Sequence, residues 1–138
     1  MADKMSPHSA LVHVMVLVAC ADREMSEQEV IMMSEMIRIL PVFRNYDVDT
    51  DLARDSEDCL AYLEKDDGVE LMLQAVADAL PPRLAETAYA LACDVATADG
   101  NVSQVELELL MIIRQTLGVG RLPAAAIERG ARARAMTL

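Results

Sequence analysis

The sequence has few aromatic residues, glycines and prolines. Among its 138 residues there are no Trp, one Phe and three Tyr, with five Gly and five Pro. β-Strands favour aromatic and β-branched residues, whereas Ala, Leu, Met and Glu, which are common here, favour helices. A chain of this length can bury one full core, and no stretch of it is a linker long enough to separate two domains. We therefore expect a single all-α domain.

Cysteine patterns typical of metal sites or disulfide frameworks are also missing. Cys20, Cys59 and Cys93 form neither a CxxC pair nor a Cys/His cluster, and the first residues show no secretory leader. An odd number of distant cysteines without a leader indicates a reducing compartment. The longest near-apolar run, residues 11–21, is about half of the ~20 residues that a membrane span requires. These features predict a cytoplasmic protein, a buried helix at 11–21 and no direct insertion into a membrane.

Charge is unevenly distributed along the chain. The net charge is −11, and most of the acidic excess lies between residues 47 and 70, where Arg54 and Lys65 are the only bases. Such a field repels phosphate backbones, so we expect no nucleic-acid binding. It would attract cations or a basic protein partner, although a solvated face is the commoner use of an acidic run. The candidate partner-binding residues are Asp47, Asp51, Asp55 and Asp58. The basic C-terminal segment, opposite in sign, would also allow head-to-tail association into a homo-oligomer.

Hydrophobic periodicity and the positions of helix-breaking Pro and Gly residues predict about seven helices in a closed bundle. Residues 1–8 are expected to form a flexible arm, followed by one domain over residues 9–138. The expected helices cover residues 9–21, 26–40, 49–65, 83–98, 103–117 and 123–135, with a further helix after the break at residues 66–68 that includes residues 71–80. Pro41, Gly68 and Gly118 mark three of the predicted helix ends.

One nine-residue motif occurs twice. Residues 21–29 and 98–106 both read Ala-Asp-x-(Glu/Asn)-apolar-Ser-x-x-Glu, and each follows one expected helix and precedes another. The chain therefore reads as a duplicated helix-turn-helix, with copies at about 9–40 and 83–118. Two copies are too few for a solenoid, which favours a closed bundle.

The motif supports two interpretations. Its Ser and Glu have the spacing of a capping box, in which each side chain binds the backbone N–H of the other residue. Its Asp lies at a helix C-terminus, where an anion is unfavourable, so the oxygen-bearing side chains could instead converge on a hard cation. The candidate metal ligands are Asp99, Asn101 and Glu106, with Asp22, Glu24 and Glu29 in the other copy. Ca²⁺ or Mg²⁺ fits such ligands better than Zn²⁺.

The spacing is not that of an EF-hand loop. Position 6, where that motif requires Gly, holds Glu27 or Gln104. Position 12, where it requires a bidentate Glu, holds Met33 or Leu110. Weak cation binding and an Asx-type turn feeding a capping box both stay open.

The doubled motif in an acidic, helical chain of this length resembles the TerB-type tellurite-resistance proteins. The resemblance covers residues 9–135 and implies a compact helical fold, a cytosolic location and a metal-linked or stress-response role without an established enzymatic reaction. Arg23 replaces the Gly100 of the second copy, which makes the second turn the better cation candidate. Similar domains attached to membrane-anchored co-chaperones imply a protein partner, such as a membrane-associated stress complex.

Catalytic motifs are absent from the sequence. No activated nucleophile, glycine-rich phosphate loop or HExxH accompanies the paired carboxylates, so we expect no enzyme. His13 is expected to be a partly buried helix residue. The leading hypothesis is a non-enzymatic stress-response or tellurite-resistance-type module that binds a divalent cation at its acidic turns. The alternative is a protein-interaction module that uses its acidic surface and no metal.

Overall fold

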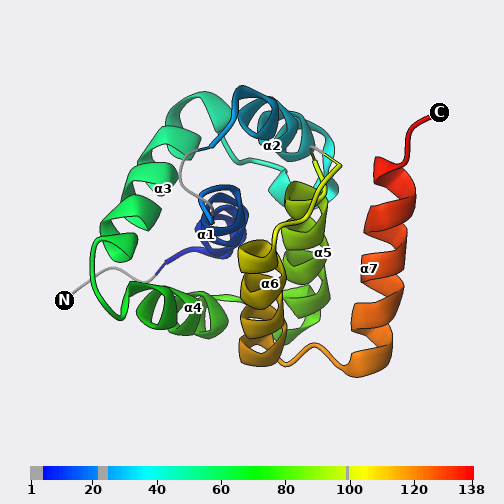
Figure 1. Cartoon of the computed structure of the whole chain (residues 1–138). Coiled ribbons are helices and arrows are strands. Elements are labelled where there is room, and N and C mark those ends of the chain that lie inside the picture. The colour runs from blue at the N-terminus through cyan, green and yellow to red at the C-terminus, as the bar shows by residue number, and fades with distance from the viewer. Residues whose placement is uncertain (1–4, 22–24, 99) are drawn as a thin grey trace.

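The computed structural model describes residues 5–21, 25–98 and 100–138, and these residues form helices without strands (Figure 1). The expected all-α class is confirmed, with seven α-helices within the described ranges. They are α1 (Pro7–Ala19), α2 (Glu27–Ile39), α3 (Val48–Leu63), α4 (Gly68–Ala79), α5 (Ala85–Ala96), α6 (Gln104–Leu117) and α7 (Arg121–Ala135). Two 3₁₀ turns, η1 (Pro41–Phe43) and η2 (Pro82–Leu84), precede α3 and α5.

Helix α1 is the centre of the molecule. Every residue from Ala10 to Ala19 is buried, and the helix packs against α3, α4, α5 and α6, which surround it in Figure 1. A helix that is apolar on all sides must be covered on all sides. Each fully buried Leu or Val contributes roughly 1.5–3 kcal/mol.

Helix α1 begins two residues before its expected start at residue 9. Pro7 and His8, expected in the arm, belong to the helix. Ser6 caps it by accepting a hydrogen bond from the Ser9 N–H at 3.0 Å, and Pro7 supplies the fixed φ that suits a first helical position. His8 is anchored as well, because its Nε2 lies 2.8 Å from the carbonyl oxygen of Val42.

Helix α7 is an outer layer laid on α5. It packs extensively against α5 and makes little contact with α6 (Figure 1). Two polar contacts join α7 to α5: the Tyr89 hydroxyl donates to Glu128 at 2.6 Å, and Arg134 pairs with Asp94 at 2.7 Å. Gly118 ends α6 in the left-handed conformation with φ 72°, as expected of a C-terminal glycine. Gly120 precedes α7 as its N-cap.

No helix among the described residues has the length and apolarity needed to cross a membrane.

The close approach of α3 and α4 gives a stability prediction at Gly68. A Cβ there would overlap the Tyr62 carbonyl oxygen and lie 2.7 Å from its carbon, and neither backbone atom can move aside cheaply. We expect Gly68→Ala to lower the free energy of unfolding by about 2 kcal/mol, as overpacking does. Urea unfolding followed by circular dichroism measures the change.

Gly130→Ala is the matched control. Its Cβ would meet only the flexible end of Arg134, at 3.3 Å. Replacing a glycine inside a helix should therefore stabilise the protein by about 0.5–1 kcal/mol. Equal effects at Gly68 and Gly130 would contradict the close approach of α3 and α4.

Candidate functional site

Both copies of the repeated motif form capping boxes. Ser26 Oγ accepts from the Glu29 N–H at 3.1 Å, and Glu29 Oε1 accepts from the Ser26 N–H at 2.9 Å. The second copy repeats this, with 3.1 Å from the Glu106 N–H to Ser103 Oγ and 3.0 Å from the Ser103 N–H to Glu106 Oε1. The capping interpretation of these Ser and Glu residues is confirmed. Glu106 is buried, whereas Glu29 is half-buried.

The acidic residues of the two turns are only partly described. Asp22, Glu24 and Asp99 lie outside the described residues, while Asn101 is exposed beside the second capping box. Within the described ranges, no group of three or more His, Cys, Asp or Glu side chains is arranged to hold a metal ion. The cation site at Asp99, Asn101 and Glu106 therefore stays a prediction.

The acidic segment is not a uniform exposed face. Asp58 is exposed, and Asp47 is the N-cap of α3, where it accepts from the Asp49 N–H at 3.0 Å. Asp51 is half-buried and lies 3.4 Å from Arg54.

Asp55 was expected on the acidic face, and the structure places it in the interior. Its exposed fraction is 1%, and it accepts a hydrogen bond from the Tyr46 hydroxyl at 2.6 Å. Burial, together with this hydrogen bond to Asp55, raises the pKa of Tyr46 above its usual value. Asp55 cannot present a charge to a partner, because its carboxylate is enclosed by the protein.

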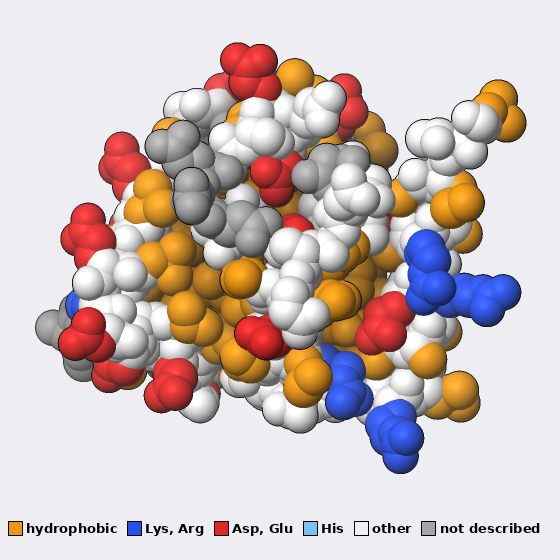
Figure 2. Space-filling model, viewed as in Figure 1, with side chains coloured by type: hydrophobic (Ala, Val, Ile, Leu, Met, Phe, Trp, Pro, Cys, Tyr) orange, Lys and Arg blue, Asp and Glu red, His pale blue; other side chains and the backbone are white. Residues whose placement is uncertain are grey.

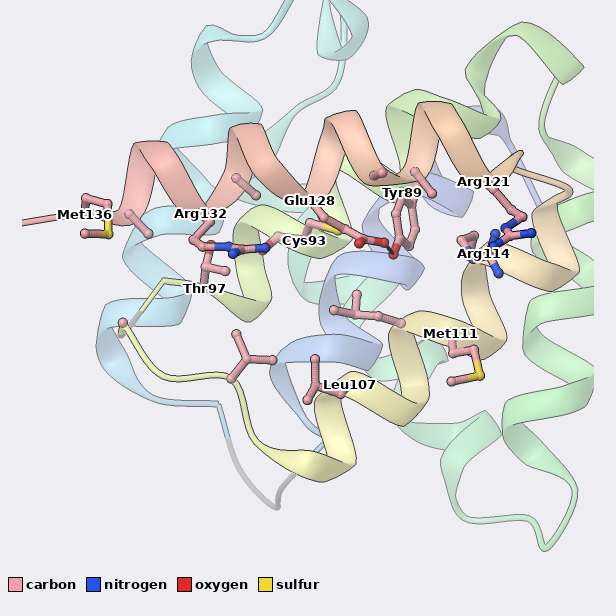
Figure 3. Close-up of a pocket in the computed structure, with 17 residues that line it drawn as sticks. Tyr89, Cys93, Thr97, Leu107, Met111, Arg114, Arg121, Glu128, Arg132 and Met136 are labelled. Atoms are coloured by element: carbon pink, nitrogen blue, oxygen red, sulfur yellow. Dashed lines mark hydrogen bonds between the residues drawn. The ribbon is translucent and has the colours of Figure 1, made fainter.

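A groove lies between α6 and α7, with α5 as its floor; we call it the α6–α7 groove (Figure 3). Its volume is about 610 Å³. Buried Tyr89 and Cys93 of α5 form part of the floor. Leu107 and Met111 line the side contributed by α6, and Met136 lies at the far end beyond α7. Exposed fractions of 54% for Met111 and 72% for Met136 leave apolar surface uncovered along the groove.

Basic side chains stand at both ends of the α6–α7 groove. Arg114 and Arg121 lie together at one end and Arg132 towards the other (Figure 3). Figure 2 shows the same division over the visible face, with basic side chains gathered around α7 and acidic ones over α2, α3 and α4. Glu128 also lines the groove, where it accepts the hydrogen bond of Tyr89. The groove thus combines an apolar floor with positive ends.

The floor of the groove offers no reactive thiol. Burial raises the pKa of the Cys93 thiol to about 12, so the thiol stays protonated at neutral pH. Burial and the hydrogen bond to Glu128 likewise raise the pKa of Tyr89. Both side chains are therefore neutral apolar surface or hydrogen-bond donors rather than nucleophiles.

The second repeated turn forms one end of the same groove. Thr97, Gly100 and Val102 contribute to its lining. Gly100 has φ 85° and donates its N–H to the Thr97 carbonyl at 3.0 Å. A side chain at this φ would be strained, which explains why the tight turn uses glycine here. The corresponding position of the first copy, Arg23, lies outside the described residues.

No protein-family model, curated protein or solved structure matches the chain. The resemblance to TerB-type proteins therefore rests on the doubled motif and on the helical composition.

The contact between Tyr89 and Glu128 should hold α7 against α5. Tyr89→Phe removes the hydroxyl but keeps the ring, so we expect a loss of about 1 kcal/mol in the free energy of unfolding. A double-mutant cycle with Glu128→Ala, which removes the acceptor, followed by urea unfolding should give a coupling energy of the same sign. A coupling energy of zero would show that the hydrogen bond does not hold α7.

Proposed function

We propose that the chain is a non-enzymatic binding module that receives an amphipathic, acidic helix of a protein partner in the α6–α7 groove. The observation that carries the proposal is the apolar floor of this groove, flanked by Arg114 and Arg121 at one end and Arg132 at the other. Peptide helices commonly bind by laying one apolar face into such a groove.

The spread of exposed apolar surface favours a helix over a small molecule. Leu107 and Met111 are about half exposed on α6, and Met136 lies beyond the end of α7. These side chains are distributed along the groove rather than gathered around one point (Figure 3). A partner helix lying along the groove can cover all of them, because its apolar residues recur every three or four positions.

The charges favour an acidic partner at this surface. Arg121 and Arg132 are exposed and available to carboxylates, whereas Glu128 already accepts a hydrogen bond from Tyr89. Opposite charges at the rim steer association and set the register of a partner. The acidic segment at Asp47, Asp51 and Asp58 is a competing surface that would take a basic partner instead.

The second candidate function is the cation-linked one. Asp99, Asn101 and Glu106 would hold Ca²⁺ or Mg²⁺ in a stress-response or tellurite-resistance-type module, with a weaker site in the first copy. Two observations support it: the motif resembles that of TerB-type proteins, and its second turn lines the α6–α7 groove through Gly100 and Val102. A cation at this turn would then set the shape of one end of the groove.

Reversing the charge of an arginine at the rim tests whether a partner helix binds in the α6–α7 groove. The probe is a fluorescein-labelled amphipathic helix with Leu on one face and Glu on the other, and its binding is followed by anisotropy. We expect Arg132→Glu to weaken binding about tenfold, since an attraction becomes a repulsion. Arg83→Glu makes the same charge change at an exposed position outside the groove and should leave affinity unchanged. Equal losses of affinity in both variants would show that the labelled helix does not bind in the α6–α7 groove.

A second probe, with Lys in place of Glu, separates the two partner surfaces. If this basic helix binds more tightly than the acidic one and loses affinity in Asp58→Lys, the acidic segment is the docking surface and the groove proposal is wrong.

Calorimetric titration with Ca²⁺, Mg²⁺, Mn²⁺ and Zn²⁺ tests whether the acidic turns bind a cation. Metal-stripped protein should show saturable binding that Asp99→Ala abolishes and Asp22→Ala reduces, because a hard cation loses a carboxylate ligand. Asp66→Ala removes an exposed carboxylate outside both turns and should have no effect. Absence of binding at millimolar metal would leave the turns as capping boxes alone.

A further inference from the structure

A second groove lies on the other side of α6, towards α4 rather than α7, and we call it the α4–α6 groove. Its volume is about 540 Å³. It is lined by the last turn of α1, the end of α3, the first turn of α4 and one side of α6. Figure 2 shows apolar side chains gathered on the visible face between α4 and α6, with acidic side chains at their edge. The two grooves share no lining residue.

The floor of the α4–α6 groove is apolar and partly open. Leu17 and Leu109 are buried in it, whereas Val105 and Ile112 of α6 are 49% and 44% exposed. Val105 and Ile112 are seven residues apart, so they lie on one side of α6 and about 10 Å apart along its axis. Uncovered apolar surface of this length fits a helix laid along α6, because the apolar residues of an amphipathic helix recur every three or four positions.

The rim of the α4–α6 groove carries charge of one sign. No described residue that lines it is basic, and Lys65 lines a different cavity, where its Nζ lies 5.8 Å from the centre of the Tyr62 ring. Four exposed carboxylates line the groove: Asp66, Asp67, Glu70 and Glu108. None of the three ion pairs among the described residues involves them, and Glu108 makes only a 3.5 Å contact with Gln104 Nε2. These carboxylates are therefore available to a cationic partner.

The ends of the surrounding helices do not reverse this charge. Helices α1 and α3 end beside the groove, and their carbonyl ends are negative, whereas α4 and α6 begin beside it with positive N–H ends. The two pairs of ends offset each other, so the carboxylates determine the sign of the field. Three of them stand where α4 begins, and Glu108 stands on α6 between Val105 and Ile112. Basic residues on either edge of a docked helix thus meet a carboxylate.

We infer that the α4–α6 groove binds an amphipathic, basic helix of a protein partner. The apolar face of this helix covers Val105 and Ile112, and its Lys or Arg side chains pair with Glu70 and Glu108. Lys and Arg fit this arrangement because their alkyl stems can lie on apolar surface while their charged ends reach the rim. An acidic helix is repelled by the same rim. The inference is independent of the α6–α7 groove, whose exposed charges have the opposite sign.

A charge-reversal pair in the full chain tests the rim. The probe is a fluorescein-labelled helix with Leu on one face and Lys on the other, and its binding is followed by anisotropy. We expect Glu70→Lys to weaken binding about tenfold, because an attraction becomes a repulsion. Asp58→Lys makes the same charge change at an exposed position outside the groove and should leave affinity unchanged. Both residues are exposed, so both variants should fold, and equal losses of affinity would overturn the inference.

Neighbouring residues of α6 separate this groove from the α6–α7 groove. Ile112 lines the first and Met111 the second, and their exposed fractions are 44% and 54%. Ile112→Ser should weaken binding of the basic helix several-fold, and Met111→Ser should not, because only Ile112 is covered. The acidic helix proposed for the α6–α7 groove should show the reverse order, so either proposal can fail alone. A basic helix that is equally sensitive to both substitutions would contradict this inference.

Cys20 reports where the basic helix binds. It is half-buried and lines the α4–α6 groove, whereas Cys59 and Cys93 are buried. Alkylation by iodoacetamide is followed by mass spectrometry at about pH 9, because burial raises the pKa of the Cys20 thiol. A saturating basic helix should slow alkylation of Cys20 about fivefold, and Glu70→Lys should remove this protection at the same helix concentration. Unchanged alkylation under a bound helix would overturn the inference.

Sedimentation velocity of the chain without the basic helix tests a different occupant. We expect the sedimentation coefficient to be the same for the chain and for Glu70→Lys. Self-association that Glu70→Lys abolishes would show that a second copy of the chain occupies the α4–α6 groove, and the inference of a partner helix would then be wrong.

Discussion

The architecture depends on covering one helix that is apolar on every side. Residues 10–19 of α1 expose almost nothing to solvent, so helices must pack around the whole circumference of α1. Helices α3, α4, α5 and α6 supply these contacts, while α2 and α7 pack outside them and bury only a few residues each. This division places most of the buried residues in the inner helices and leaves more exposed surface on the outer ones. The α6–α7 groove follows from it, because α7 rests on α5 without closing against α6.

Polar groups inside such a core are either hydrogen-bonded or remain as unsatisfied buried atoms. Asp55 accepts a hydrogen bond from the Tyr46 hydroxyl, and the buried Cys59 thiol donates to the carbonyl of His13 at 3.7 Å. In the His13 ring only one of the two nitrogens, Nδ1, has a hydrogen-bond partner among the described residues. A buried imidazole with one satisfied nitrogen differs from a surface histidine, whose second nitrogen simply binds water.

The features that the sequence predicts well are those that depend on neighbours within one helical turn. The capping boxes at Ser26 and Ser103 involve residues three positions apart, and both form. Asp55 was assigned to the surface because acidic residues surround it in the sequence. Helical spacing gives the better signal: Asp55 lies four residues before buried Cys59 and three after Leu52, so it shares their inward face. The groove has no local signal of this kind, because its width is set by how the small residues of α7, such as Ala124 and Ala131, pack on α5.

The two copies of the motif follow different helices, so a ligand bound at each turn would have a different effect on the rest of the protein. The first turn follows α1. Because α1 is buried on all sides, this helix cannot move easily, so a ligand bound at the first turn would change little beyond that turn. The second turn joins α5, the floor of the α6–α7 groove, to α6, one of its sides, and its Gly100 and Val102 lie in the groove lining. A shift of this turn would therefore alter the groove directly. Both copies of the motif thus cap a helix through their Ser and Glu residues, and in the second copy Gly100 and Val102 also line the α6–α7 groove.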